Sequence, residues 1–441
     1  MAWLAQFYES PLLVAAIRIA ATAALFATVA ALWRRGGTRF LLSPALFIAL
    51  QCVLLYSAFI STGLRYGERE WLVTVAGANL QNYSGSRAEA AVLGFGMLAL
   101  FAALYPHRRD GRATHSNGAY STLSIGSVAL LATATALAGS AFYLAEAHIP
   151  AIADFGHSGI GREIHHILAP AISFSLAVLV FGAVKRPAVI QLSIGLLVVV
   201  CALSMMRAMQ APVPIFMMFG LGLLWCVGAR ISLRRAAALG VGCCLLFAAV
   251  IQAKTNQINV RENRVPAVTF TGTLASKLLV RQMTSAGCLN NIFERGAAAG
   301  LSGNPFYFAG AIVPRAFYPD KPNLSRGAEF AQNHCGRVIS VNPDHSESIT
   351  LLGEPMLEAR YAGLIAAQAV LLVLLCLLTR AAASPAAIGP VFVAATLPWT
   401  AAFQQHFALY LANGLKMFLA MIPLAVLFWL CCRLGRRAAR P

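Results

Sequence analysis

The sequence predicts an all-α polytopic membrane protein with about eleven transmembrane helices and one long polar loop, and three observations predict it. First, 59% of the 441 residues are hydrophobic and only 11% are charged, which excludes an ordinary soluble domain. Second, apolar runs long enough to cross ~30 Å of hydrocarbon recur along the chain. Third, only residues 252–353, about 100 residues, form a long connection between such runs.

The predicted transmembrane helices form a group of eight before the long loop and a group of three after it. Each is an apolar run bounded by polar or charged residues. The runs are 11–33, 40–64, 89–105, 119–146, 164–184, 187–206, 212–229, 235–251, 355–379, 387–405 and 407–431. The chain therefore divides into helices 1–8 (1–251), the large loop (252–353) and helices 9–11 (354–441).

The distribution of Lys and Arg predicts the orientation in the membrane. The net charge of +18 would suggest a nucleic-acid partner in a soluble protein, but here most cations lie at the ends of apolar runs. One set of short connections, together with the C-terminal tail, holds sixteen cations and the alternate set holds five. The positive-inside rule places the richer set in the cytoplasm. The C-terminus is then cytoplasmic, and the N-terminus and the long loop lie outside; no nucleic-acid partner is expected.

The long loop carries ten cations and six acids. An external loop gains nothing from the positive-inside effect, so this balance indicates either an anionic ligand or contact with anionic headgroups. Arg315 and Lys321 lie among three prolines, which stiffen the backbone. Such a turn suits a diphosphate, because Arg binds it bidentately and Lys acts as a point charge. The alternative is a structural turn in which Asp320 pairs with Lys321.

Three further arginines are predicted near the outer face: Arg162, Arg207 and Arg281. Cations near membrane depth are costly and are usually functional, although each could instead extend to the headgroups. The fairly apolar stretch 296–313 is a candidate for a helix lying on the membrane surface.

His345 and Glu354 are the candidate general bases. A sugar hydroxyl that attacks an anomeric carbon benefits from a group that accepts its proton. The alternative for Glu354 is that it caps the N-terminus of its own helix. The pair His165–His166 has no carboxylate or Cys partner at ligand spacing, so no metal site is predicted, and no cofactor is expected.

Cys288 and Cys335 are the only cysteines of the long loop. An external, oxidising compartment allows a disulfide between them, and two free thiols are the equally simple alternative.

The loop and the helix after it resemble the O-antigen and exopolysaccharide repeat-unit polymerases of the Wzy type. The resemblance rests on Gly303-x-Pro-Phe-Tyr, on Val313-Pro-Arg-Ala-Phe-Tyr-Pro-Asp-Lys-Pro322, and on Ser346-x-Ser348 leading to Gly353-Glu354. Tyr361-Ala-Gly363 stands where many members have an aromatic residue followed by Gly. The match covers roughly 303–363.

This resemblance implies a metal-independent glycosyltransferase of the GT-C class in a bacterial inner membrane. Such an enzyme joins undecaprenyl-diphosphate-linked repeat units at the periplasmic face. The diphosphate would be bound by Arg315 and Lys321, assisted by Arg162, Arg207 and Arg281, with Glu354 or His345 as base. The partners would be lipid-linked glycans and the bilayer, and a polysaccharide chain-length regulator is a candidate protein partner.

Two other functions remain open from the sequence. An O-antigen ligase would use a similar donor and a lipid A core acceptor. A lipid-linked glycan flippase, or another transporter, would account for the charged residues inside apolar runs, but such proteins usually contain paired repeats and none is evident here.

Overall fold

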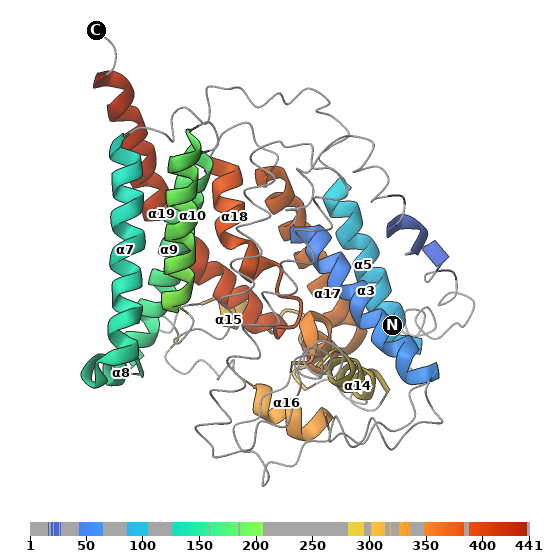
Figure 1. Ribbon diagram of the computed structural model, residues 1–441. Coiled ribbons are helices and arrows are strands. Elements are labelled where there is room, and N and C mark those ends of the chain that lie inside the picture. The colour runs from blue at the N-terminus through green and yellow to red at the C-terminus, as the bar shows by residue number, and fades with distance from the viewer. Residues whose placement is uncertain are drawn as a thin grey trace.

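The computed structural model describes residues 16, 19–20, 22–25, 27, 44–64, 86–104, 126–157, 159–183, 186–205, 281–294, 301–313, 318, 326–335, 348–382 and 388–438. All regular secondary structure in these ranges is helical (Figure 1). The predicted helices 212–229 and 235–251 lie outside the described residues, and 11–33 is described at scattered positions, which are helical.

Eight of the predicted transmembrane helices are present as helices. They are α3 (Pro44–Leu64), α5 (Ser86–Leu104), α7 (Gly126–His148), α9 (Gly159–Ala183), α10 (Ala188–Met205), α17 (Thr350–Ala382), α18 (Ile388–Thr400) and α19 (Phe407–Ala438). Four described helices, α5, α7, α17 and α19, contain apolar stretches long enough to cross a membrane. The other four have shorter apolar stretches of 10–17 residues. The all-α membrane architecture is therefore supported, whereas the total of eleven transmembrane helices stays a prediction.

Several predicted boundaries were wrong. α17 begins at Thr350 rather than at 355, and α19 ends at Ala438 rather than at 431. α9 begins at Gly159 rather than at 164, because the polar turn Gly161–His166 continues the helix beyond the apolar run. α18 ends at Thr400 rather than at 405, and residues 401–405 form turns before α19. Hydrophobicity marks where a helix is apolar, not where its backbone hydrogen bonds end.

The helices pack into two groups, each with its own apolar core. One core joins α3, α5, α17 and the loop helix α14 (Arg281–Glu294). The other joins α7, α9, α10, α18 and most of α19. The first residues of α19, including Phe407 and Tyr410, belong to the first core, so α19 connects the two groups (Figure 1).

The helices of the long loop gather at one end of the bundle. α14, α15 (Ala309–Ile312) and α16 (Gly327–His334) lie at the lower end in Figure 1, as does α8 (Pro150–His157). The C-terminal end of α19 lies at the opposite end. Two segments predicted on opposite sides of the membrane thus lie at opposite ends of the bundle.

The prediction of a surface helix over 296–313 was wrong for its described part. Residues 301–308 form bends and turns, and only the four residues of α15 are helical. Asn304 explains part of this, because its side-chain oxygen accepts the Phe306 N–H at 2.8 Å and so forms a local turn.

Candidate functional site

The candidate site is built around a break in α17. Residues 350–358 form a first helical segment, and the backbone then leaves helical geometry at Ala359 (φ −143°) and Arg360 (φ 53°, ψ −142°). A positive φ is unusual for arginine and costs energy unless the surroundings enforce it. At Gly363 a Cβ atom would lie 2.4 Å from the Pro355 carbonyl oxygen. Glycine is therefore required for the chain to pass this close to its own first segment.

A loop from far away in the sequence caps the end of this first segment. The Leu301 N–H donates to the Leu357 carbonyl at 3.0 Å, and the Ser302 and Gly303 N–H groups donate to the Glu358 carbonyl at 3.1 and 3.0 Å. Gly303 adopts φ +62°, which glycine reaches at little cost. Carbonyls freed by the break are thus satisfied by residues 301–303, the last of which opens the phrase that carries the sequence resemblance.

Glu354 is buried within this first segment, with 3% of its surface exposed. Its Oε2 accepts the backbone N–H of Ala408 at 2.8 Å, at the start of α19. The alternative that Glu354 caps its own helix is therefore wrong. α17 begins at Thr350, and the side chains of Ser348 and Thr350 accept the early N–H groups of that helix.

Tyr307 brings a hydroxyl to the neighbourhood of Glu354. This oxygen is buried close to the Glu354 carboxylate. Burial, with the nearby carboxylates of Glu354 and Glu358, raises the pKa of the Tyr307 hydroxyl. The hydroxyl therefore remains a proton donor at neutral pH.

Arg326 links α16 to the break. Its Nη1 donates to Glu358 Oε1 at 2.6 Å, and its Nε and Nη2 donate to the two oxygens of Glu329 at 2.8 and 2.7 Å. The guanidinium also lies 4.9 Å from the centre of the Phe330 ring. The bonds to Glu329, and then to Glu358, raise the pKa of Arg326, while Arg326 lowers the pKa of Glu329. The guanidinium therefore neutralises the buried Glu358 carboxylate.

His406 completes the cluster from the turn before α19. Its ring packs edge-on against Phe330, with the ring centres 4.8 Å apart. Its Nδ1 is buried with no hydrogen-bond partner in the described part of the chain. Burial, and then the positive charge of Arg326, lowers the pKa of His406 to about 4. The imidazole is therefore neutral at physiological pH.

A disulfide anchors the other end of α16. This is one of the two alternatives that the sequence left open for the cysteines of the long loop. Cys288 of α14 is bonded to Cys335, directly after α16. The Asn291 side-chain amide also donates to the His334 carbonyl at 3.0 Å. α16 is thus fixed by Arg326 at its start and by the disulfide at its end.

The structure describes three of the seven sequence-predicted site residues. Glu354 lies in the cluster. Arg162 lies in the first turn of α9, near α8, and Arg281 is the first residue of α14, which packs against α17. The remaining four, Arg315, Lys321, His345 and Arg207, lie outside the described residues.

The sequence prediction did not include Tyr307, Arg326, Glu358 or His406. Two had a usable signal: Tyr307 closes the Gly303-x-Pro-Phe-Tyr phrase, and Glu358 follows Glu354 by four residues, on the same helix face. Arg326-x-x-Glu329 has ion-pair spacing, but a solvated pair would give the same pattern. No local signal marks His406, because it is covered by residues distant in the sequence, such as Phe330 of α16.

Among the described residues, no group of three His, Cys, Asp or Glu side chains is arranged to hold a metal ion. His165 has a partner that its spacing did not reveal: its Nε2 lies 2.9 Å from Glu146 Oε1, and its ring stacks on Tyr143. This pair joins α7 to α9.

Comparison with protein-family models, with curated proteins and with solved structures finds no match to this chain.

Proposed function

We propose that this protein polymerises undecaprenyl-diphosphate-linked oligosaccharide repeat units at the periplasmic face of a bacterial inner membrane, as a metal-independent glycosyltransferase of the GT-C class. One observation carries the proposal. Gly303, Tyr307, Glu354 and Gly363, all from phrases quoted for the resemblance, lie on or around the first segment of α17. Residues separated by about sixty positions thus form one site at the loop end of the bundle.

In the proposed reaction a hydroxyl of the acceptor repeat unit attacks the anomeric carbon of the donor glycan. The new bond joins that carbon to the acceptor oxygen, while the bond from the carbon to the diphosphate oxygen breaks. The acceptor proton passes to a base, for which Glu354 is the described candidate and His345 the alternative. Because the Ala408 N–H is bonded to Oε2 of Glu354, the proton would go to Oε1.

The departing diphosphate requires fixed positive charge. We assign this role to Arg315 and Lys321, assisted by Arg162, Arg207 and Arg281. Arg326 is a poor candidate, since two carboxylates already bind its guanidinium. Its role is to hold α16 against the end of the first segment of α17, where a cation is also favoured by the helix dipole.

The test replaces Arg315 in a polymerase-null strain that expresses this chain. Arg315→Ala should lose nearly all long polymer, with a fall in rate on the order of a hundredfold. Arg315→Lys should lose most of the long polymer, because lysine keeps the positive charge but cannot bind the diphosphate through two parallel N–H groups as the guanidinium does. Lys321→Ala should be milder. Arg380→Ala, at the far end of α17, is the control. Polymer length on gels, with blotting for protein level, is the measurement, and full-length polymer from Arg315→Ala would remove Arg315 from the site.

A lipid-linked glycan transporter is the second candidate, and the break in α17 favours it, because transporters place binding sites at interrupted helices. Purified protein in detergent separates the two. A polymerase lengthens lipid-linked repeat units without a bilayer, whereas a transporter has no reaction to perform there. Offering a lipid A core as acceptor in the same assay separates a ligase from a polymerase.

A further inference from the structure

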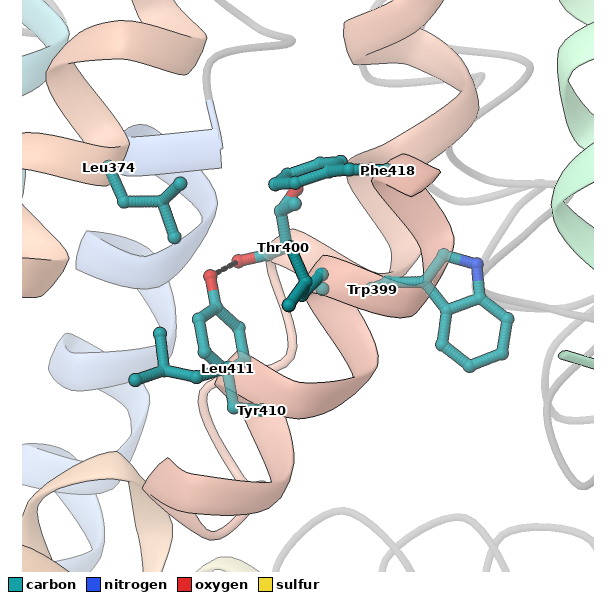
Figure 2. Close-up of a pocket in the computed structure, with 8 residues that line it drawn as sticks. Leu374, Trp399, Thr400, Tyr410, Leu411 and Phe418 are labelled. Carbon is teal, nitrogen blue, oxygen red and sulfur yellow. Dashed lines mark hydrogen bonds between the residues drawn. The ribbon is translucent and has the colours of Figure 1, made fainter. Parts of the chain in front are cut away.

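An apolar cavity lies between α17, α18 and α19. Its volume is about 170 Å³. Figure 2 shows Leu374 of α17 and Tyr410, Leu411 and Phe418 of α19 around it, with the Tyr410 hydroxyl turned toward α18. That hydroxyl donates to the Thr400 carbonyl at 2.7 Å, and the Trp399 indole nitrogen is directed away from Tyr410. The cavity therefore presents hydrocarbon to an occupant.

The cavity lies directly beyond the candidate site along α19. Glu354 is bonded to the N–H of Ala408, in the first turn of this helix. Gly414, which lines the cavity, is six residues further on, or ~9 Å at the rise of an α-helix. Going along α19, a buried carboxylate at the loop end is thus followed by an apolar cavity on the membrane side.

Apolar surface is exposed on the helix turns beside the cavity. The next turns of α17 and α19 expose large apolar side chains: Val373 is 59% and Leu377 57% exposed, and Leu419 and Ile422 are 50% and 52% exposed. Exposed apolar surface of this kind is expected where a membrane helix faces lipid. A chain lying in the bilayer would therefore meet apolar surface beside the cavity.

We infer that this cavity binds the first isoprene units of the polyprenyl chain that carries the donor glycan. The inference rests on the proposed function, which places the lipid diphosphate at the loop end. The size is suitable, since an apolar cavity of about 150 Å³ binds a molecule as small as benzene. A polyprenyl chain also carries a methyl branch on every isoprene unit, and the notch left by Gly414 offers space for such a branch. A Cβ placed on Gly414 meets no described atom within 4 Å.

The same space provides the test variant. Gly414→Leu should occupy the cavity without moving the backbone. Gly195→Leu in α10 is the matched control, because a Cβ there also meets no described atom within 4 Å and Gly195 is remote from the site. Both variants should reach the membrane at the wild-type level.

The first measurement is photolabelling in nanodiscs with a polyprenyl phosphate that carries a diazirine on an early isoprene unit. Mass spectrometry should find the label on the peptides of α17, α18 or α19 that line the cavity. Gly414→Leu should lower this labelling about tenfold. A loss of affinity of this size is expected when one to two CH₂ groups of the polyprenyl chain are no longer buried in the cavity. Gly195→Leu should leave it unchanged. A phosphatidylcholine with a diazirine on its acyl chain should label the lipid-facing residues of these helices, and Gly414→Leu should leave that labelling unchanged.

The second measurement is polymerisation with donors of different chain length. Gly414→Leu should raise KM about tenfold for a polyprenyl donor and leave KM unchanged for a donor whose diphosphate carries only a methyl group in place of the polyprenyl chain. An equal fall in acyl-probe labelling in Gly414→Leu, or polyprenyl labelling and kinetics that Gly414→Leu leaves unchanged, would overturn the cavity assignment alone. A wild-type protein that forms no polymer from any donor would instead overturn the proposed function.

Discussion

Glu354 combines two tasks in one buried carboxylate. It accepts the Ala408 N–H and so joins the first segment of α17 to the start of α19. It also lies beside the Tyr307 hydroxyl, which can donate a proton or a hydrogen bond. A carboxylate has two oxygens, so the structural bond leaves one oxygen for chemistry.

Substitutions at Glu354 should separate these tasks. Glu354→Gln keeps a side-chain oxygen for the Ala408 N–H and should leave the amount and thermal stability of the protein near the wild-type values, while polymer formation falls by at least a hundredfold, as expected when a general base is lost. Glu354→Ala should also lose stability by ~1–3 kcal/mol, because a buried N–H is left without an acceptor. Polymer yield and thermal unfolding in detergent give the two readouts. Normal polymer from Glu354→Gln would exclude this residue as the base.

His406 should make the protein sensitive to mild acid. Its pKa is about 4 in the folded protein, below the ordinary value of 6.5. Between these values the unfolded chain binds a proton that the folded chain does not, so the free energy of unfolding falls as the pH falls from 6.5 toward 4. Between pH 7 and pH 5 this one group should account for about 2 kcal/mol.

His406→Phe should remove that part of the acid sensitivity and retain the packing on Phe330. The measurement is thermal unfolding at pH 7 and pH 5, with His148→Phe, at an exposed position, as control. An unchanged difference between the two pH values in His406→Phe would show that other groups cause the acid sensitivity.

At the scale of elements, the break in α17 and the position of α16 depend on each other. The loop 301–303 satisfies the carbonyls at the break, and Arg326 pairs with Glu358 one residue before it. The Cys288–Cys335 disulfide holds α16 on α14, and a closed loop of this kind typically contributes ~2–4 kcal/mol. Three independent connections therefore fix the polypeptide around Glu354.

Gly363 tests whether the break is required. Gly363→Ala should destabilise the protein by ~1–3 kcal/mol, because the new Cβ lies 2.4 Å from the Pro355 carbonyl oxygen and the backbone must shift. Gly94→Ala in α5, where a Cβ meets no described atom within 4 Å, should instead stabilise the helix by up to ~1 kcal/mol. Thermal unfolding of the two variants should shift in opposite directions. A Gly363→Ala protein as stable as wild type would mean that the close approach to Pro355 is not needed.

At the scale of the whole molecule, the bundle has two distinct ends. The loop helices and α8 lie at one end and the C-terminal turns of α19 at the other (Figure 1). Because the C-terminal tail is rich in arginine, the positive-inside rule predicts that its end faces the cytoplasm. The same rule then predicts that the candidate site faces the outside of the membrane, as the proposed function requires.

Cysteine labelling checks this orientation. In a background without free thiols, Gln332→Cys on the exposed side of α16 should react with a membrane-impermeant maleimide in intact spheroplasts. Arg437→Cys, in the last turn of α19, should react only after permeabilisation. Labelling of position 332 from the cytoplasmic side alone would place the site on the wrong side for a periplasmic polymerase.

The sequence by itself determined the features that depend on composition and local pattern. Apolar runs predicted the membrane class and eight of the described helices. A segment that crosses hydrocarbon must satisfy its backbone hydrogen bonds internally, so a long apolar run is expected to be a helix. The phrase around Glu354 located part of the site, and an external loop with two cysteines allowed the disulfide. Each of these follows from a property of neighbouring residues or of one segment.

The tertiary structure alone decided what joins at the site. Nothing in the spacing of Glu354 indicates that its partner is the Ala408 N–H, 54 residues later. The break at Ala359–Arg360 lies in an apolar run that reads as one helix, because hydrophobicity does not report backbone dihedral angles. Likewise, His406 is buried against Phe330 of α16, far earlier in the sequence. These properties come from contacts between segments that are distant in the sequence. The free energy of such contacts exceeds the conformational preference of any one segment, so no short stretch of the sequence reveals them.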